Sequence, residues 1–208
     1  MNKSTMRLVL ASASPRRAEL LHAAGYTFEI LAVDLDERVH GDEAPAAYVA
    51  RLARDKAGAA MQRFEERAQR SCHGPERSAL DDLIVLGADT AVVVDGTILG
   101  KPRDDSDAAA MLAALSGRRH DVLTGVSLRS LAGERQLVEA TGVYMSVLTA
   151  DDIAWYIRSG EGRDKAGSYA VQGLASRFVT RIEGSYSNVV GLPIATVSAL
   201  LRELASRG

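Results

Sequence analysis

The sequence lacks the features of several large classes of protein. It has a single cysteine, Cys72, which excludes an internal disulfide and a site built from several cysteines, so a reducing compartment is the simplest setting. No apolar run approaches the roughly 20 residues that a membrane-spanning helix requires. The apolar stretch after Arg7 extends over only about five residues, too few for the core of a signal peptide. We therefore expect a soluble, cytoplasmic protein with no membrane partner.

An excess of charge of one sign is also missing. The 25 lysine and arginine residues nearly balance the 27 aspartate and glutamate residues, which leaves a formal net charge of −2. This balance argues against a protein that coats nucleic acid through its phosphates, and against adhesion to anionic lipid. We expect no nucleic-acid partner. A local basic pocket is still compatible with the composition, because net charge does not describe how charges cluster.

The composition is ordinary for a globular protein and favours one domain over residues 1–208. Strand and helix patterns alternate along the chain. Asp95-Gly96 between two short apolar runs predicts a hairpin, and Thr149 with Asp152 resembles the capping box at the start of a helix. Hairpins and crossovers together predict the α/β class with a mixed sheet. The polar residues 65–82 are predicted to form a surface insertion within this domain.

The first candidate site lies where a short apolar strand meets a helix that begins at Ser14-Pro15. Arg16 and Arg17 follow in the first helical turn, where the helix dipole favours acidic residues. Two arginines at this position therefore indicate an anionic ligand such as a polyphosphate, to which Ser12 and Ser14 could also donate. The alternative is a well-capped helix with two solvated arginines. The segment is not a Walker P-loop, because the sequence contains no such motif.

The second candidate is Asp89, which follows the apolar run at residues 83–88. Ligands of open α/β sheets bind at the carboxyl ends of strands, and Mg²⁺ prefers one or two carboxylates together with substrate phosphates. A second carboxylate could come from Asp34, Asp36 or Glu37. In the alternative interpretation Asp89 caps a turn and the acidic group faces solvent.

Three lysines, Lys56, Lys101 and Lys165, lie beside apolar or glycine-rich segments. Each alone could be an ordinary solvated side chain. Together with the two arginines they could form a clamp that stabilises phosphate charge. The histidines show no metal-ligand spacing, and the sequence has neither a nucleophile elbow nor a dinucleotide-binding fingerprint. The residues alone thus indicate a metal-assisted enzyme that acts on a phosphorylated small molecule.

These segments, taken in order, resemble the motifs of the Maf family of nucleoside triphosphate pyrophosphatases over nearly the whole chain. Residues 65–82 add no family motif. The resemblance rests on residues 10–21, Asp36-Glu37, 51–57, Gly87-Ala88-Asp89-Thr90, Gly100-Lys101-Pro102, 115–117 with His120, 164–167, Gly184-Ser185-Tyr186 and 190–193.

The resemblance implies hydrolysis of a nucleoside triphosphate to the monophosphate and pyrophosphate with a divalent cation, Mg²⁺ or Mn²⁺. It implies a mixed central sheet in two lobes with the active-site cleft between them, similar to inosine triphosphate pyrophosphatase, and a homodimer. Asp89 would activate or orient the attacking water and would hold the metal with Glu37. The residues implied at the triphosphate are Ser12, Arg16, Arg17, Lys56, Lys101 and Lys165.

Residues 164–173 resemble the subgroup of the family that acts on dTTP and UTP. In this subgroup Arg16, Thr90 and Gln172 would set specificity. A glutamine amide offers one donor group and one acceptor, which suits the alternating edge of uracil or thymine. Without the resemblance, Gln172 would be interpreted as a turn amide whose hydrogen bonds are satisfied within the protein.

Two other functions are compatible with the same residues. The first is a nucleotide-binding regulator of cell division or septum formation whose hydrolysis is vestigial. Such a regulator would not need the Asp89 side chain, so replacing it separates the two hypotheses. The second is a nucleotidyltransferase, for which the sequence offers no recognisable acceptor site.

Overall fold

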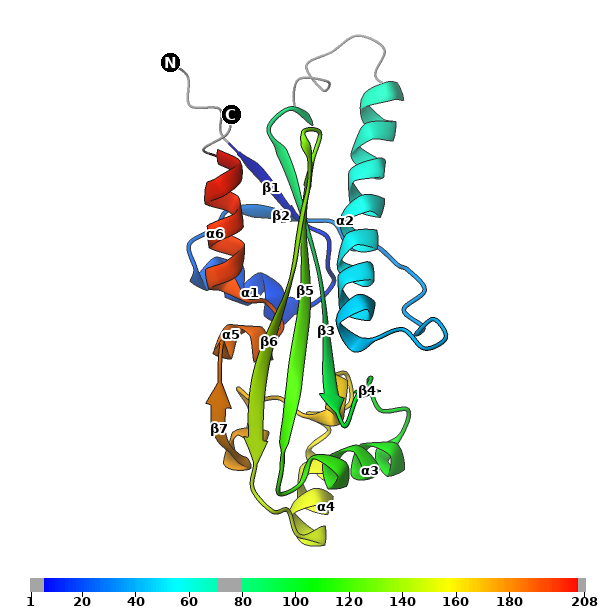
Figure 1. The fold of residues 1–208 in the computed structure, drawn as a ribbon, viewed down its shortest axis with the longest axis vertical. Helices are drawn as coiled ribbons and strands as arrows, with labels where there is room; N and C mark the ends of the chain where they lie inside the picture. The colour runs from blue at the N-terminus through cyan, green and yellow to red at the C-terminus, as the bar shows by residue number, and fades with distance from the viewer. Residues whose placement is uncertain (1–5, 71–79, 206–208) are drawn as a thin grey trace.

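The computed structural model describes residues 6–70 and 80–205, and one mixed sheet runs along the long axis of the molecule (Figure 1). In the described residues the strand order is β2-β1-β3-β5-β6-β7, with β4 paired to β3. β1 pairs in parallel with β2 and β3, and the remaining pairs are antiparallel. The prediction of a mixed α/β sheet is therefore confirmed. The strands are β1 Arg7–Leu10, β2 Phe28–Ile30, β3 Leu83–Val94, β4 Thr97–Leu99, β5 Arg119–Ser130, β6 Gly133–Met145 and β7 Val179–Glu183.

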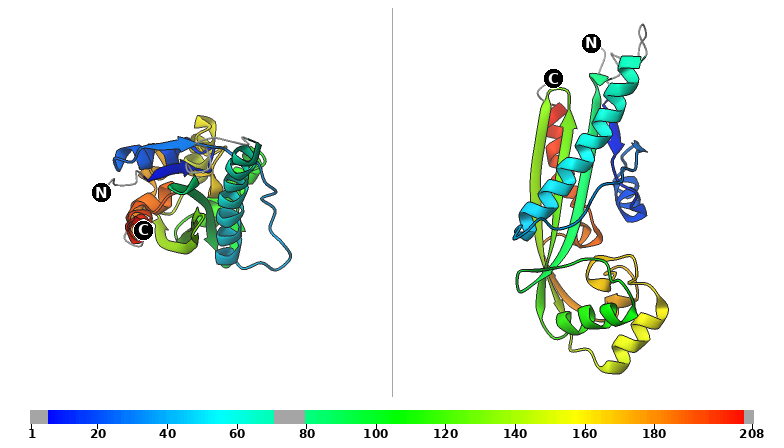
Figure 2. Two further views of the ribbon diagram at one scale, coloured as in Figure 1. Left: turned by 90° about the horizontal axis from the view of Figure 1, so that it is seen from above. Right: turned by 90° about the vertical axis from the view of Figure 1, so that its right-hand side faces the viewer.

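Helices cover both faces of the upper part of the sheet, with α2 on one side and α1 and α6 on the other (Figure 2). Alternate residues of β1 explain this layering, because successive side chains of a strand point to opposite faces. Val9 packs with α2, whereas Leu8 and Leu10 pack with Val197 and Leu201 of α6. The helices are α1 Pro15–Ala23, α2 Pro45–Arg70, α3 Asp105–Leu115, α4 Ala150–Ser159, α5 Tyr186–Val190 and α6 Ile194–Ala205, with short 3-10 turns η2 Ala166–Ser168 and η3 Leu174–Arg177.

The long strand β3 contributes to hydrophobic cores at both ends of the sheet. Leu86 lies in the core with α1 and α6, and Val92 lies in a second core with α3, α4 and the segment before β7. β5 likewise supplies Val126 and Leu128 to the first core and Val122 to the second. Figure 1 shows β3, β5 and β6 side by side along the long axis of the molecule. The protein therefore has two packed halves joined by shared strands.

Glycines allow α2 to lie unusually close to this sheet. A Cβ atom on Gly87 of β3 would lie 2.1 Å from the carbonyl oxygen of Ala53. A Cβ atom on Gly125 of β5 would lie 2.2 Å from the carbonyl oxygen of Val49. Real Cβ atoms cannot approach a backbone oxygen this closely, so the contact between α2 and the sheet depends on glycine at both positions.

One expectation about the strands was wrong. The sequence predicted a strand end before Asp89, but β3 continues to Val94 and carries Asp89 in its middle. β5 pairs with β3 beyond this point, whereas the parallel partner β1 stops at Leu10, opposite Leu86. Asp89 therefore lies just beyond the end of the parallel ladder.

The predicted insertion falls partly outside the described residues. Residues 65–70 form the last turns of α2, and residues 71–79 are not described. The insertion therefore stays a prediction. In the part of the chain that the structure covers, no helix is both long and apolar enough to cross a bilayer.

Candidate active site

A cavity of about 540 Å³ lies beside the middle of β3. Its walls come from the β1–α1 turn, α2, β3, the segment after β4, the segment around η2 and the residues that follow α5. Every residue that the family resemblance assigns to the site lines this cavity. These residues are Ser12, Arg16, Arg17, Glu37, Lys56, Asp89, Thr90, Lys101, Lys165 and Gln172.

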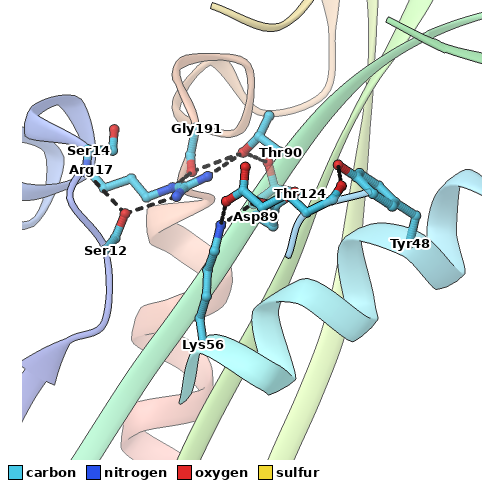
Figure 3. Close-up of polar contacts among 10 residues, drawn as sticks. Ser12, Ser14, Arg17, Tyr48, Lys56, Asp89, Thr90, Thr124 and Gly191 are labelled. Atoms are coloured by element: carbon cyan, nitrogen blue, oxygen red, sulfur yellow. Dashed lines mark hydrogen bonds and ion pairs between the residues drawn. The ribbon is translucent and has the colours of Figure 1, made fainter. Parts of the chain in front are cut away.

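A lysine of the cavity wall lies between two carboxylates, and Figure 3 shows its contact with one of them, Asp89. The Lys56 Nζ atom is 2.7 Å from Asp89 Oδ1 and 2.7 Å from Glu37 Oε1. The Lys56 and Asp89 side chains are buried, so each depends on the other to compensate its lost hydration. Burial raises the pKa of Glu37, but the hydrogen bond from Lys56 and the surrounding positive charges outweigh it and hold that pKa below its usual value. Glu37 is therefore a carboxylate at neutral pH.

The loop that carries Glu37 is attached to α2. The Tyr48 hydroxyl donates to the Glu37 carbonyl at 2.9 Å, and Arg51 bonds to the Arg38 carbonyl and to the Glu43 carboxylate. Asp36, in contrast, pairs with Arg38 at the surface and does not line the cavity. Of the acidic group at residues 34–37, only Glu37 faces Asp89 across Lys56.

Arg17 joins three parts of the fold and is almost fully buried (Figure 3). Its Nε atom donates to the Gly191 carbonyl at 2.8 Å, Nη1 donates to Ser12 Oγ at 3.0 Å, and Nη2 donates to Thr90 Oγ1 at 3.1 Å. Burial lowers the pKa of Arg17, and the charge of Asp89 partly offsets that effect. The guanidinium thus ties α1 to β3 and to the segment after α5.

The start of α1 remains available to an anion. Ser14 occupies the predicted N-cap position, but its side chain makes no capping hydrogen bond, and the first turn contains no acidic residue. Arg16 lines the cavity, and its only ion pair in the described residues is a 4.0 Å contact with Asp164. Free N–H groups at a helix N-terminus next to a partly exposed arginine suit a phosphate group.

The far wall of the cavity combines apolar side chains with one amide. Val92, Tyr169 and Val171 supply the apolar surface. The Gln172 amide lines the same wall, is exposed, and makes no hydrogen bond within residues 6–70 and 80–205. The interpretation of Gln172 as a turn amide satisfied by the protein is therefore wrong. Lys165, on the adjoining turn, donates to the Glu161 carbonyl and to Asp164.

Sequence reasoning missed some contributors to the site. Thr124 Oγ1 on β5 lies 2.9 Å from Thr90 Oγ1, which also contacts Arg17. Nothing in the sequence distinguishes Thr124 from other threonines of a buried strand. The Gly191 carbonyl could have been suspected only from the family motif at residues 190–193, because a backbone acceptor leaves no mark in side-chain composition.

The donor set fits a divalent cation that also binds phosphate. In the described part of the chain no group of three or more histidine, cysteine or acidic side chains gathers around one point. Glu37 and Asp89, however, converge on the same Lys56 ammonium group. Two carboxylates completed by substrate phosphates and water are typical ligands of Mg²⁺, so the residues are compatible with such an ion.

His120 lies behind the cavity wall. Its Nε2 atom is 2.8 Å from the Tyr169 hydroxyl, and its Nδ1 atom has no partner among the described residues. Burial lowers the pKa of His120 to about 4 from its usual 6.5. The imidazole is therefore neutral in the folded protein at neutral pH.

This buried histidine predicts a specific loss of stability in acid. Below pH 6.5 the unfolded chain binds a proton at His120 that the folded chain does not bind until the pH reaches about 4. The free energy of unfolding should thus fall over this interval, by up to about 3 kcal/mol from this group. Urea unfolding at pH 7.5 and 4.5 measures the loss in wild type and in His120→Gln. The variant should lose less, and an equal loss in both proteins would contradict the prediction.

Comparison with known proteins places the chain in a family. A family model described as "Maf-like protein" matches residues 7–204. A dTTP/UTP pyrophosphatase of Methylobacillus flagellatus is 47% identical over 202 residues, which cover 97% of this chain and 94% of that protein. A protein of the same name from Anaeromyxobacter dehalogenans is 48% identical over 200 residues, with 94% and 93% covered. A solved structure of the Staphylococcus aureus Ham1 protein gives a TM-score of 0.49 at 13% identity, with 95% of this chain and 98% of that chain covered. The match over residues 7–204 and the identity to these relatives show that the chain belongs to the Maf-like protein family.

Proposed function

We propose that this protein hydrolyses dTTP and UTP to the monophosphate and pyrophosphate with the help of a divalent cation, Mg²⁺ or Mn²⁺. The observation that carries the proposal is a cavity that several cationic side chains line together with a pair of carboxylates, and whose far wall holds an amide with no hydrogen-bond partner among the described residues. The relatives named dTTP/UTP pyrophosphatase support the choice of substrate.

The triphosphate would occupy the basic part of the cavity. The start of α1 offers N–H groups and the Arg16 guanidinium, and Lys101 and Lys165 line the same cavity. Fixed positive charges of this kind stabilise the charge that develops when a phosphoryl bond breaks. Arg17 contributes by holding Ser12 and Thr90 in position, because its own donors are largely occupied within the protein.

Asp89 would position the water that attacks the α-phosphorus. A new bond forms between the water oxygen and the α-phosphorus as the bond from that phosphorus to the bridging oxygen breaks, and pyrophosphate leaves. The proton released by the water passes to the Asp89 carboxylate and then to solvent. A cation held by Glu37 and Asp89 would neutralise phosphate charge and lower the pKa of bound water. Lys56 lies between the two carboxylates and contacts both.

The base would lie against the apolar wall with its polar edge at Gln172. The amide can donate to a carbonyl oxygen of uracil or thymine and accept from N3–H. Arg16 lines the same cavity and would act with Gln172 in setting specificity. Thr90 acts indirectly, since its hydroxyl is engaged by Arg17 and Thr124.

A nucleotide panel tests this function. Pyrophosphate release is measured for dTTP, UTP, CTP, ATP and 7-methyl-GTP, each with Mg²⁺ and with Mn²⁺. We expect dTTP and UTP to be the fastest substrates, because the Gln172 amide can donate to the 4-oxygen of their bases and accept from N3–H. Turnover of 7-methyl-GTP without turnover of dTTP would contradict the proposal. Tight nucleotide binding without any release would instead favour the nucleotide-binding regulator.

A further inference from the structure

Gln172 makes no hydrogen bond within the described residues, yet a recognition amide must be held in one place. It lies between Ala170 and Leu174 in a segment that forms the far wall of the cavity. The backbone N–H groups of Ala170, Leu174 and Ala175 all donate to side chains that do not line the cavity. These N–H groups bracket Gln172 on both sides.

The Glu161 carboxylate holds the backbone on both sides of Gln172, directly on one side and through Tyr156 on the other. Glu161 Oε1 accepts from the Leu174 N–H at 2.8 Å, and Oε2 accepts from the Ala175 N–H at 3.4 Å. The Tyr156 hydroxyl donates to Glu161 Oε2 at 2.7 Å and accepts from the Ala170 N–H at 3.1 Å. The path from one side of Gln172 to the other therefore runs through Tyr156 and Glu161.

The packing around these groups leaves little freedom. Tyr156 on α4 is 1% exposed, and its ring lies in the core beside Phe178. A Cβ atom on Gly173 would lie 2.0 Å from Glu161 Oε1, so the residue next to Gln172 must be glycine for the carboxylate to reach its partners. The carboxylate thus fills the space under the backbone that carries the recognition amide.

We propose that Glu161, acting directly and through Tyr156, is the positioning residue that sets which base the cavity accepts. The proposal rests on the proposed pyrophosphatase function and on Gln172 as the group that contacts the base. Glu161 contacts neither the base nor the phosphates, since it does not line the cavity. It holds the backbone on each side of Gln172 in a single conformation, and so orients the amide toward the pyrimidine edge.

The test is a comparison of UTP with CTP, because an amino group replaces the 4-oxygen of uracil and inverts the edge that Gln172 would contact. Glu161→Gln keeps the shape of the side chain but replaces one acceptor oxygen with an NH₂ group that faces backbone N–H donors. Tyr156→Phe keeps the ring in the core and removes only the hydroxyl that Ala170 and Glu161 share. Glu66→Gln is the matched control, because Glu66 lies exposed on α2 and bonds only to Gln62 among the described residues.

We expect the KM for UTP to rise about tenfold in Glu161→Gln, and the ratio of kcat/KM for UTP to that for CTP to fall about tenfold. The kcat for UTP should change less than about threefold, because Asp89 and Lys56 lie on other elements. Tyr156→Phe should shift the ratio in the same direction, and Glu66→Gln should leave it unchanged. Thermal midpoints establish that each variant is folded.

The outcomes separate this inference from the function on which it rests. Wild type that releases no pyrophosphate from UTP or dTTP overturns the proposed function. Wild type that hydrolyses UTP but does not favour it over CTP overturns the contact between Gln172 and the base, and the inference with it. Wild type that favours UTP, with the same ratio in Glu161→Gln and Tyr156→Phe, overturns the inference alone. An equal fall in kcat/KM for UTP and CTP in these variants also overturns the inference alone, because it shows a structural effect without a change in base preference.

Discussion

Pyrophosphate release from UTP is expected to fall by about 10² to 10⁴-fold when Asp89 is replaced by asparagine. Asparagine keeps the size of the side chain but cannot take a proton from water, and it offers a metal ion no charge. It also removes one of the two carboxylates that contact the Lys56 ammonium group at 2.7 Å. Initial rates with saturating UTP and Mg²⁺ measure the effect.

The control for this change is Asp151→Asn, at an exposed position in the first turn of α4. It should retain the wild-type rate. Nucleotide binding by Asp89→Asn, measured by calorimetry, should persist because the basic residues of the cavity are intact. An Asp89→Asn protein that keeps the full rate would exclude Asp89 from the chemistry. A cell-division phenotype that persists in the Asp89→Asn variant would favour the nucleotide-binding regulator over the hydrolase.

Replacing Gly87 by alanine is expected to lower the free energy of unfolding by about 3 kcal/mol or more. The new Cβ atom would lie 2.1 Å from the Ala53 carbonyl oxygen and 2.8 Å from the Ala57 amide nitrogen, so α2 and β3 must separate. Because α2 carries Lys56 and β3 carries Asp89, this separation should also lengthen their contact and reduce the rate. Urea unfolding measures the stability, and pyrophosphate release measures the rate.

Gly100→Ala serves as the matched control for stability. A Cβ atom on Gly100 would meet no atom within 4 Å apart from its chain neighbours, and Gly100 has no positive φ, so the added methyl group enters open space. Its urea midpoint should stay near that of wild type. A Gly87→Ala midpoint equal to that of Gly100→Ala would show that α2 does not pack against β3 as closely as described.

Local signals predicted much of the secondary structure. The capping box at Thr149 and Asp152 is present, and the turn at Asp95-Gly96 joins β3 to β4. These signals depend on residues close in sequence, which is why they could be interpreted without a structure. The order of the strands could not be predicted, because the pairing of β1 with β3 joins segments that are far apart in the chain. The wrong prediction for the end of β3 has the same cause. Asp89-Thr90 resembles the end of a strand in the sequence, but pairing with β5 continues the strand through these two polar residues.

The sequence predicted which types of residue form the site, but not the contacts between them. Arginines in the first turn of α1 violate a local rule, and that violation indicated a ligand before any fold was known. The contact of Lys56 with both carboxylates requires α2, β3 and the Glu37 loop to meet, so spacing could not reveal it. The anchoring of the far wall by Glu161 was missed for the same reason, because its partners are backbone groups without a sequence signature.

The core beside α6 joins segments that lie far apart in the sequence, because Leu8 and Leu10 of β1 pack with Val197 and Leu201. During synthesis the apolar face of β1 therefore stays uncovered until α6 has left the ribosome. The Gly191 carbonyl that holds Arg17 lies directly before α6, so the phosphate end of the cavity is completed at the same late stage. A ribosome that stalls before residue 194 releases a chain with an exposed hydrophobic strand and no assembled site, which makes such products natural substrates for chaperones and proteases.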